Sequence, residues 1–387
     1  MHTATPTGTA ATTPITTRGA RLVGDRTLVS RGATRGVLDT LHLEGVRDHL
    51  RTLAAKQEPE DFERSFSHLH ISFTDGRVTA QLLGPQGLSG DPMVVSRNGF
   101  AQMSAELLPG RMGSNLLDTA DHSPSGEKIA TLAWAEWSRT DTKPRMFRSV
   151  KMRDTDGQVK RMLRSQHSQG YGTYDNLRFV EDLLANADEL RDLPVGQFTL
   201  SDSGMRLRFL GKPKEEITLR EPTPMIEAWN SEVGRRRVGL VGGMWKLICT
   251  NGMGSWDKKS EYHWRHFGEG DRIGRGVASA MAEIQTAASG VIDAYTKALD
   301  VSIDDAFAWM EREMQGLATQ AFTARAIEAL DHETTTPGKG LASVIDAITL
   351  EAQSEDLFTQ ADMEALAANL LRRGLSQATR ERILVEA

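Results

Sequence analysis

The chain has 387 residues, of which 39% are hydrophobic and 25% charged, so it is long enough for one large or two ordinary domains with buried cores. No apolar run approaches the roughly 18 residues that a membrane helix needs, so we expect no membrane span. The single cysteine excludes an internal disulfide. The first 17 residues contain eight threonines and no Lys, Arg, Asp or Glu, unlike a secretory signal. We therefore expect a disordered tail over residues 1–25 and a cytoplasmic location.

The net charge of −6 is unevenly distributed along the chain. Residues 301–387 carry 15 acidic and 7 basic side chains, whereas residues 143–164 carry eight basic and two acidic ones. The overall negative charge argues mildly against a nucleic-acid-binding protein. The concentrated basic window is typical of a surface that binds phosphate groups, and it keeps that class of protein open.

Strand signals prevail in the first 220 residues, after one helix. Residues 37–56 have apolar side chains at helical spacing and predict a helix that ends before Pro59. The dipeptide Asp75-Gly76, between residues 68–72 and 77–83, predicts a hairpin with a type I′ turn. We expect further strands at residues 129–137, 198–201, 205–210 and 217–220. Their spacing favours antiparallel pairing.

Helical spacing marks one segment between these strands and prevails from Val277 almost to the end of the chain. Residues 177–193 predict a helix that packs on the sheet, and an apolar stripe from Val277 predicts a long helix. Ser302 with Asp305 is a weak capping box, residues 334–340 form an expected linker, and helices are expected at residues 341–350 and 361–373, the last ended by Gly374. The predicted fold class is α+β, with a curved antiparallel sheet and packed helices over residues 26–275 and a helical region over residues 276–387.

Residues 164–176 connect the basic window to the helix expected at residue 177. Asp175 or Asn176 stands where an N-cap belongs, because a short side-chain oxygen there can accept a free amide of the first turn. Gly170 and Gly172 beside Tyr171 also suit a flexible loop that lays an aromatic ring along nucleic acid. The sequence favours the structural interpretation and leaves the second open.

Residues 229–272 combine eight basic and five acidic residues with four tryptophans. Turn chemistry explains part of the pattern, since Asn251-Gly252 is a common hairpin dipeptide and Gly239, Gly242 and Gly243 are typical of bulges or close backbone approach. It does not explain the arginine triplet or the alternation of Trp with Lys and Arg. Such residues suit single-stranded nucleic acid, because aromatic rings stack on any base and cations neutralise phosphate. A solvated basic face over a tryptophan core is the structural alternative.

Neither metal nor cofactor chemistry is indicated. Cys249 with His263 and His266, or His68 with His70, lacks the four-ligand spacing of a zinc site. Cys249 lies beside apolar residues with no adjacent basic group, which favours a buried thiol over a nucleophile. No standard catalytic signature occurs in the chain, so we predict no cofactor and do not assign an enzymatic activity.

Three short elements, taken in order, resemble a known family. They have the patterns S-x-x-Y-x-x-x-D-N, N-S-E-x-G and C-T-N-G, and are carried by Ser168, Tyr171, Asp175, Asn176, Asn230, Ser231, Glu232, Gly234, Cys249, Asn251 and Gly252. Together they resemble the phage and plasmid proteins grouped as domain of unknown function family 932. The likeness covers about residues 30–385, and it departs from the family on both sides of Tyr171, where Gln169, Gly170, Gly172 and Thr173 replace charged residues. It implies a mobile-element protein in a bacterial cytoplasm rather than a mechanism.

The leading hypothesis is a DNA-binding accessory protein of phage or plasmid type that binds or anneals single strands in recombination. The residues expected to contact nucleic acid are Arg148, Lys151, Arg153, Lys160, Arg161, Arg164, Tyr171, Arg235, Arg236, Arg237, Trp245, Lys246, Lys258, Lys259 and Arg265. The alternative is a non-enzymatic structural or protein-interaction module, and we expect a homo-oligomer. A metal-dependent nuclease or hydrolase that uses Asp175 and Glu232 is a third hypothesis.

Overall fold

The computed structural model describes residues 28–30, 42–153, 158–212, 216–217, 221–248, 251–256, 261–266, 271–332 and 340–386. Over these residues the chain forms helices and two β-sheets, which confirms the predicted α+β class. The tail expected at residues 1–25 and most of the expected linker lie outside the described residues. No described helix is both long and apolar enough to cross a membrane.

The larger body of the molecule contains the main sheet, which has seven described strands in the order β1-β9-β10-β11-β12-β13, with β14 also beside β12. All its pairings are antiparallel. The strands are β1 (Leu28–Ser30), β9 (Val195–Leu200), β10 (Met205–Leu210), β11 (Pro222–Asn230), β12 (Val238–Ile248), β13 (Asn251–Trp256) and β14 (Tyr262–Trp264). β9 and β10 confirm two predicted strands.

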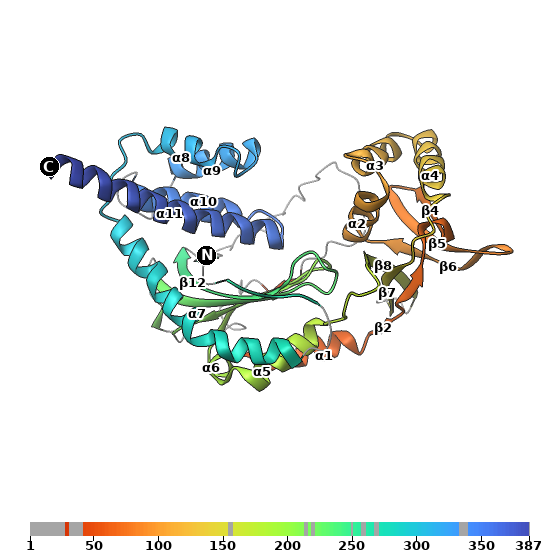
Figure 1. Cartoon of the computed structure of the whole chain (residues 1–387), viewed down its shortest axis with the longest axis horizontal. Coiled ribbons are helices and arrows are strands. Elements are labelled where there is room, and N and C mark those ends of the chain that lie inside the picture. Colours follow the sequence, from red (N-terminus) through yellow and green to blue (C-terminus); the bar gives the residue numbers. More distant parts are fainter. Residues whose placement is uncertain are drawn as a thin grey trace, which may run out of the picture.

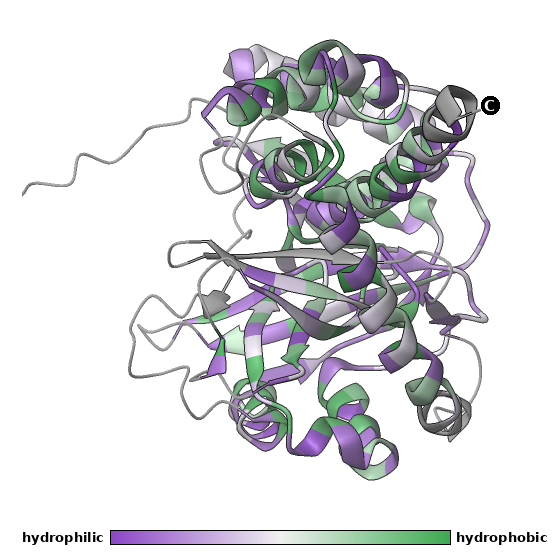
Figure 2. Ribbon diagram, turned by 90° about the vertical axis from the view of Figure 1, so that its left-hand side faces the viewer, coloured by the Kyte–Doolittle hydropathy of each residue, from purple (hydrophilic) through white to green (hydrophobic). Residues whose placement is uncertain are grey.

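Helices cover both faces of the main sheet, as Figure 1 shows. One face is covered by α1 (Leu43–Ala54), α5 (Asn176–Asn186), α6 (Asp188–Arg191) and the first half of α7 (Asp271–Ala298). The second half of α7 joins α8 (Ala306–Met314), α9 (Gln320–His332), α10 (Leu341–Ala352) and α11 (Leu357–Glu386) in another core. Figure 2 shows these layers from the side, with hydrophobic residues frequent in the helices above the sheet.

The second lobe, at the right of Figure 1, contains a separate sheet of seven described strands. Its order is β2-β7-β8-β6-β5-β4 with β3 beside β7, and only β6 and β8 are parallel among the described pairs. The strands are β2 (Gln57–Pro59), β3 (Phe62–Arg64), β4 (Leu69–Thr74), β5 (Arg77–Gly84), β6 (Gly87–Val95), β7 (Arg145–Arg153) and β8 (Val159–His167). The 3-10 turn Phe66–His68 and the helices α2 (Arg97–Leu107), α3 (Met112–His122) and α4 (Pro124–Ser138) complete this lobe. Strands that we expected in one sheet are thus divided between two.

The hairpin predicted from Asp75-Gly76 is confirmed. β4 and β5 pair directly on either side of the dipeptide, with Thr74 opposite Arg77. Asp75 has a φ of 50° and Gly76 a φ of 66°, and two successive positive φ angles are what a type I′ turn requires.

The strand predicted at residues 129–137 is wrong, because this segment belongs to α4. Ser123 caps the helix by accepting the Gly126 amide at 3.0 Å, and Pro124 occupies its first turn. Trp134 is fully buried against the second sheet, whereas Leu132 is 70% exposed. A short, mostly apolar run is compatible with both the helical and the strand periodicity. The N-cap and the burial pattern show that this segment is a helix.

Three predicted helix boundaries also need correction. The helix expected over residues 177–193 is interrupted at Ala187, which separates α5 from α6. The N-cap of α8 is Asp305, whose side chain accepts the Ala308 amide at 3.0 Å, rather than Ser302. α11 continues through Gly374, where a Cβ would lie 2.6 Å from the Leu341 side chain of α10. That glycine permits close helix packing and does not end the helix.

The glycine-rich stretch of β12 and β13 forms regular strands. Ile248 pairs with Asn251, so Asn251 and Gly252 belong to β13 and are not the turn that we predicted. A Cβ at Gly242 would lie 2.0 Å from the backbone oxygen of Ile284, so this glycine lets α7 approach β12 closely. Residues 218–220 of another predicted strand lie outside the described residues.

A buried network of ion pairs attaches α11 to the main sheet. Arg206 and Arg208 of β10 contact Glu227 of β11 at 2.6 and 2.8 Å, and both also bond to Glu364 of α11. Burial would raise the pKa of Glu227, but the two guanidinium groups outweigh it and hold this pKa below its usual value. The network therefore keeps the carboxylate charged and fixes the position of the C-terminal helix.

Candidate functional site

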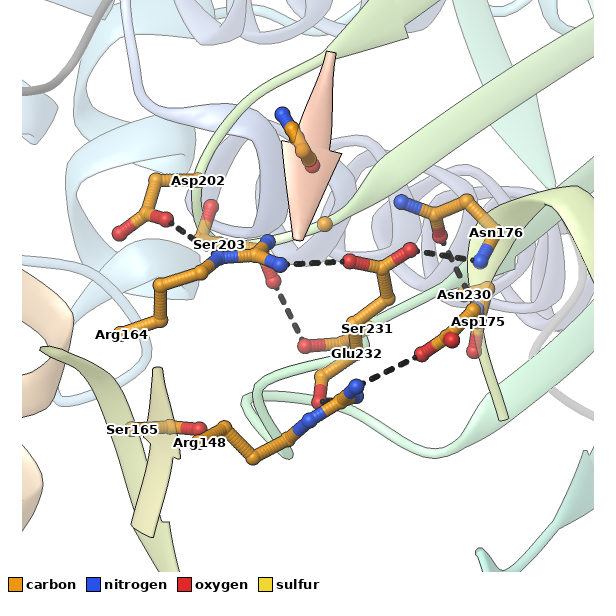
Figure 3. Close-up of polar contacts among 12 residues, drawn as sticks. Arg148, Arg164, Ser165, Asp175, Asn176, Asp202, Ser203, Asn230, Ser231 and Glu232 are labelled. Atoms are coloured by element: carbon orange, nitrogen blue, oxygen red, sulfur yellow. Dashed lines mark hydrogen bonds and ion pairs between the residues drawn. The ribbon is translucent and has the colours of Figure 1, made fainter. Parts of the chain in front are cut away.

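Two of the family-like sequence elements meet where the second lobe joins the larger body (Figure 3). The Asn230 amide donates to the backbone oxygen of Tyr174 and to the side-chain oxygen of Asn176, both at 2.9 Å. Ser231 donates to the Ser203 backbone oxygen at 2.6 Å. The Asn230 contacts connect the end of β11 to the start of α5, and the Ser231 contact connects it to the β9–β10 turn.

Glu232 is the centre of this junction. It accepts the backbone amide of Asn176 at 2.7 Å and so caps α5 from outside the helix. It also forms an ion pair with Arg164 at 2.8 Å. Burial would raise the pKa of Glu232, but Arg164 and the Asn176 amide hold it below its usual value. Asp175 occupies the predicted N-cap position, but its side chain binds Arg148 instead of the helix.

Arg148 and Arg164 fasten the second lobe to the larger body. Arg148 of β7 contacts Asp61 at 3.2 Å and Asp175 at 2.9 Å, and Arg164 of β8 contacts Asp202 at 3.0 Å. Burial would lower the pKa of Arg148, but the carboxylates outweigh it and raise this pKa. Both guanidinium groups thus have carboxylate partners, and Arg148 is only 6% exposed. Arg148 and Arg164 are therefore bound within the protein, and we no longer expect them to bind phosphate.

The other cations of the basic window do not approach this junction. Lys151 pairs with Glu58 and Arg161 with Glu60, at 3.2 and 2.7 Å. Arg153 and Lys160 are exposed at the opposite end of the β7–β8 pair. The window is therefore not one continuous basic surface.

An aromatic stack lies beside the junction. Tyr171 stacks on His167 with ring centroids 3.8 Å apart and on His266 at 5.2 Å, with interplanar angles of 5° and 14°. Its hydroxyl donates to the Ser231 backbone oxygen at 3.3 Å. The ring already makes its stacking contacts within the protein, so we assign Tyr171 to this stack rather than to a nucleic-acid base.

Both imidazoles of the stack are neutral at physiological pH. Burial, with the charge of Arg148 adding to it, lowers the pKa of His167 to about 3 and that of His266 to about 4. His167 hydrogen-bonds to Ser165 at 2.8 Å. Neither ring nitrogen of His266 has a hydrogen-bond partner among the described residues, although the residue is only 6% exposed.

An open pocket of about 400 Å³ adjoins the stack and is lined by Tyr171, residues 234–237, Arg265 and His266. We call it the arginine pocket. Arg235, Arg237 and Arg265 are exposed, and the Arg235 guanidinium lies near enough to Asp356 to attract its carboxylate. Three cations therefore line one concave surface. Two of them come from the β11–β12 connection, and the third directly follows β14.

The arginine triplet is divided between two roles. Arg236 pairs with Glu261 at 2.9 Å and Asp362 at 3.4 Å, and its guanidinium lies 4.8 Å from the Trp229 ring. It is therefore largely neutralised by the protein. Gly234 precedes the triplet with a φ of +70°, which favours glycine, and a Cβ there would lie 2.7 Å from His167.

Trp245 and Lys246 lie in the interior rather than on a binding surface. Trp245 is 8% exposed and packs in an apolar cluster, and Lys246 is 3% exposed. The Lys246 ammonium contacts the Tyr295 hydroxyl at 2.6 Å and Asp346 at 2.5 Å. Stacking by Trp245 and phosphate binding by Lys246 are excluded in this conformation. Lys258, Lys259 and Cys249 lie outside the described residues.

Among the described residues, no group of three His, Cys, Asp or Glu side chains lies close enough to hold a metal ion. Asp175 and Glu232, the carboxylates of the hydrolase hypothesis, are bound by Arg148 and Arg164. The His263 imidazole lies 3.3 Å from the Glu261 carboxylate. In the sequence, His263 and His266 stand on opposite sides of Arg265. Sequence reasoning overlooked His167, whose importance comes from the stack and not from any local pattern.

We find no match to this chain among models of protein families, curated proteins or solved structures. The resemblance to family 932 stays a prediction from its sequence elements. Two of these elements, around Asp175 and Glu232, are neighbours in space.

Proposed function

We propose that the protein binds single-stranded nucleic acid through the arginine pocket, and that this nucleic acid is DNA. The observation that carries the proposal is the convergence of Arg235, Arg237 and Arg265 beside the unpartnered imidazole of His266. Guanidinium groups form charge-assisted hydrogen bonds with phosphate oxygens, so a phosphate backbone suits this surface.

The proposed contacts are to the nucleic-acid backbone. Tyr171 stacks internally and Trp245 is buried, so the described pocket offers cations rather than free aromatic faces. Binding would therefore tolerate any base sequence, and the bases would stay accessible to a second strand. Because the bases of the bound strand would stay accessible, we extend the proposal to annealing with a complementary strand.

The test is the affinity of a fluorescent oligothymidylate, measured by anisotropy. A triple variant, Arg235→Gln, Arg237→Gln and Arg265→Gln, should bind at least about tenfold more weakly than the wild type at moderate salt. The matched control replaces the exposed Arg77, Arg97 and Lys128 of the second lobe with Gln, and changes net charge equally. Equal losses in both variants, or no binding by the wild type, would refute the proposal.

The cellular setting follows from the resemblance rather than from the pocket. We place the protein in a bacterial cytoplasm, as an accessory factor of a phage or plasmid that acts as a homo-oligomer. The excess of acidic residues after residue 300 would limit non-specific binding by repelling phosphate.

A protein-interaction module is the second candidate, and exposed apolar residues on α4 favour it. Ile129 is 58% and Leu132 70% exposed in the second lobe. A second copy of this chain could cover them. Sedimentation velocity tests this candidate, since a Leu132→Asp variant should dissociate an oligomer built on this face. An unchanged oligomer would exclude that face as the interface.

A further inference from the structure

His266 is the one residue of the arginine pocket whose side chain is both buried and without a described hydrogen-bond partner. Its backbone oxygen accepts the Gly172 amide at 2.8 Å, and its ring stacks on Tyr171. The imidazole is thus held in place while its nitrogens remain unused. A neutral imidazole has one N–H donor, and a buried donor without an acceptor is unfavourable, so a ligand whose acceptor oxygen reaches this ring would satisfy it.

The arginines around His266 provide more positive charge than one internal phosphate requires. Arg235 and Arg237 come from the β11–β12 connection, and Arg265 directly follows β14. Arg236, in contrast, is neutralised by Glu261 and Asp362. Three exposed guanidinium groups therefore line the pocket beside the imidazole, and one of them, Arg235, is also attracted by the Asp356 carboxylate.

We infer that the arginine pocket binds a phosphomonoester, the phosphate group at the end of a nucleic-acid strand. An internal phosphodiester has one negative charge and two free oxygens. A terminal phosphate has a charge of about −1.5 to −2 at neutral pH and three strong acceptor oxygens. The second group matches the three guanidinium groups and the imidazole N–H in both charge and hydrogen-bonding capacity.

This inference rests on the proposed function, and the test separates the two. Oligothymidylates of about 15 nucleotides would be compared with a hydroxyl or a phosphate at the 5′ end, and then at the 3′ end, at about 150 mM salt. The fluorescent label would be placed at the opposite end. Unlabelled thymidine monophosphate, thymidine and inorganic phosphate would serve as competitors.

A phosphate at one of the two ends should tighten wild-type binding about tenfold or more, because it adds charge-assisted hydrogen bonds. The ratio of the two affinities should approach one in an Arg237→Gln, Arg265→Gln variant and stay at its wild-type value in an Arg77→Gln, Arg97→Gln control. All four arginines are exposed, so these variants should fold, and His266→Gln would test the imidazole separately.

Equal wild-type binding of phosphorylated and unphosphorylated strands would overturn the inference and leave the proposed function intact. Competition by inorganic phosphate as strong as that by thymidine monophosphate would overturn the assignment to a strand end, since the pocket would then recognise phosphate alone. No binding of any strand would overturn the proposed function as well.

Discussion

Acidification should destabilise the protein through His167 and His266. Both imidazoles are buried, and their pKa values of about 3 and about 4 in the folded state lie below the ordinary value of 6.5. The unfolded chain therefore binds more protons between pH 4 and 6.5. Stability is greatest above this range and falls as the pH decreases through it.

The magnitude follows from these values. Each histidine should contribute about 2 kcal/mol less stability at pH 5 than at pH 7, so the pair should account for about 4 kcal/mol. Arg148 faces both rings and opposes their protonation, whereas Glu232 favours protonation of His266 to a smaller extent. The pKa of Glu232 itself lies below 4.5, so its contribution is lost only at more acidic pH.

Urea denaturation at pH 7 and pH 5 measures this effect. A His266→Phe variant keeps an aromatic ring in the stack but cannot be protonated, so its loss between the two pH values should be about 2 kcal/mol smaller than that of the wild type. A variant at the exposed His332, His332→Gln, should show the wild-type loss. Equal stability of the wild type at both pH values would refute the assignment of neutral, buried imidazoles.

Packing and charge give two further predictions. Gly242→Ala would place a Cβ 2.0 Å from the Ile284 backbone oxygen and should destabilise the protein by about 2 kcal/mol or more, whereas Gly290→Ala, with no atom within 4 Å, should stabilise α7 by up to about 1 kcal/mol. Similar unfolding midpoints for the two variants would contradict the close approach of α7 to β12. Glu364→Gln would leave a buried positive charge uncompensated and should cost about 3 kcal/mol or more, unlike Glu328→Gln at an exposed position. Unchanged stability of the Glu364 variant would show that the network is not a charged one.

Local chemistry made parts of the fold predictable. The Asp75-Gly76 hairpin follows from two residues that tolerate positive φ, and the stripe of α7 follows from helical spacing. The strand prediction for residues 129–137 is wrong because a short apolar run suits a strand as well as a helix. The sequence predicts a helix stop at Gly374 because glycine often follows a helix, and only the position of Leu341 on α10 shows why a glycine is needed inside α11.

The candidate site was predictable as a region but not residue by residue. The arginine triplet and Arg265 indicated a basic surface, and the pocket contains them. Which cations face solvent depends on carboxylates that are distant in sequence, such as Asp61 for Arg148 and Asp346 for Lys246. No local pattern reveals such pairs, because tertiary structure alone brings them together.

The salt dependence of single-stranded DNA binding tests the central claim most directly. If Arg235, Arg237 and Arg265 each neutralise one phosphate, the logarithm of the association constant should fall with the logarithm of salt concentration at a slope of about −2, and the triple Gln variant should lose that slope. The control variant of the second lobe should keep the wild-type slope. Equal slopes for wild type and triple variant would contradict the claim that the arginine pocket binds the nucleic-acid backbone.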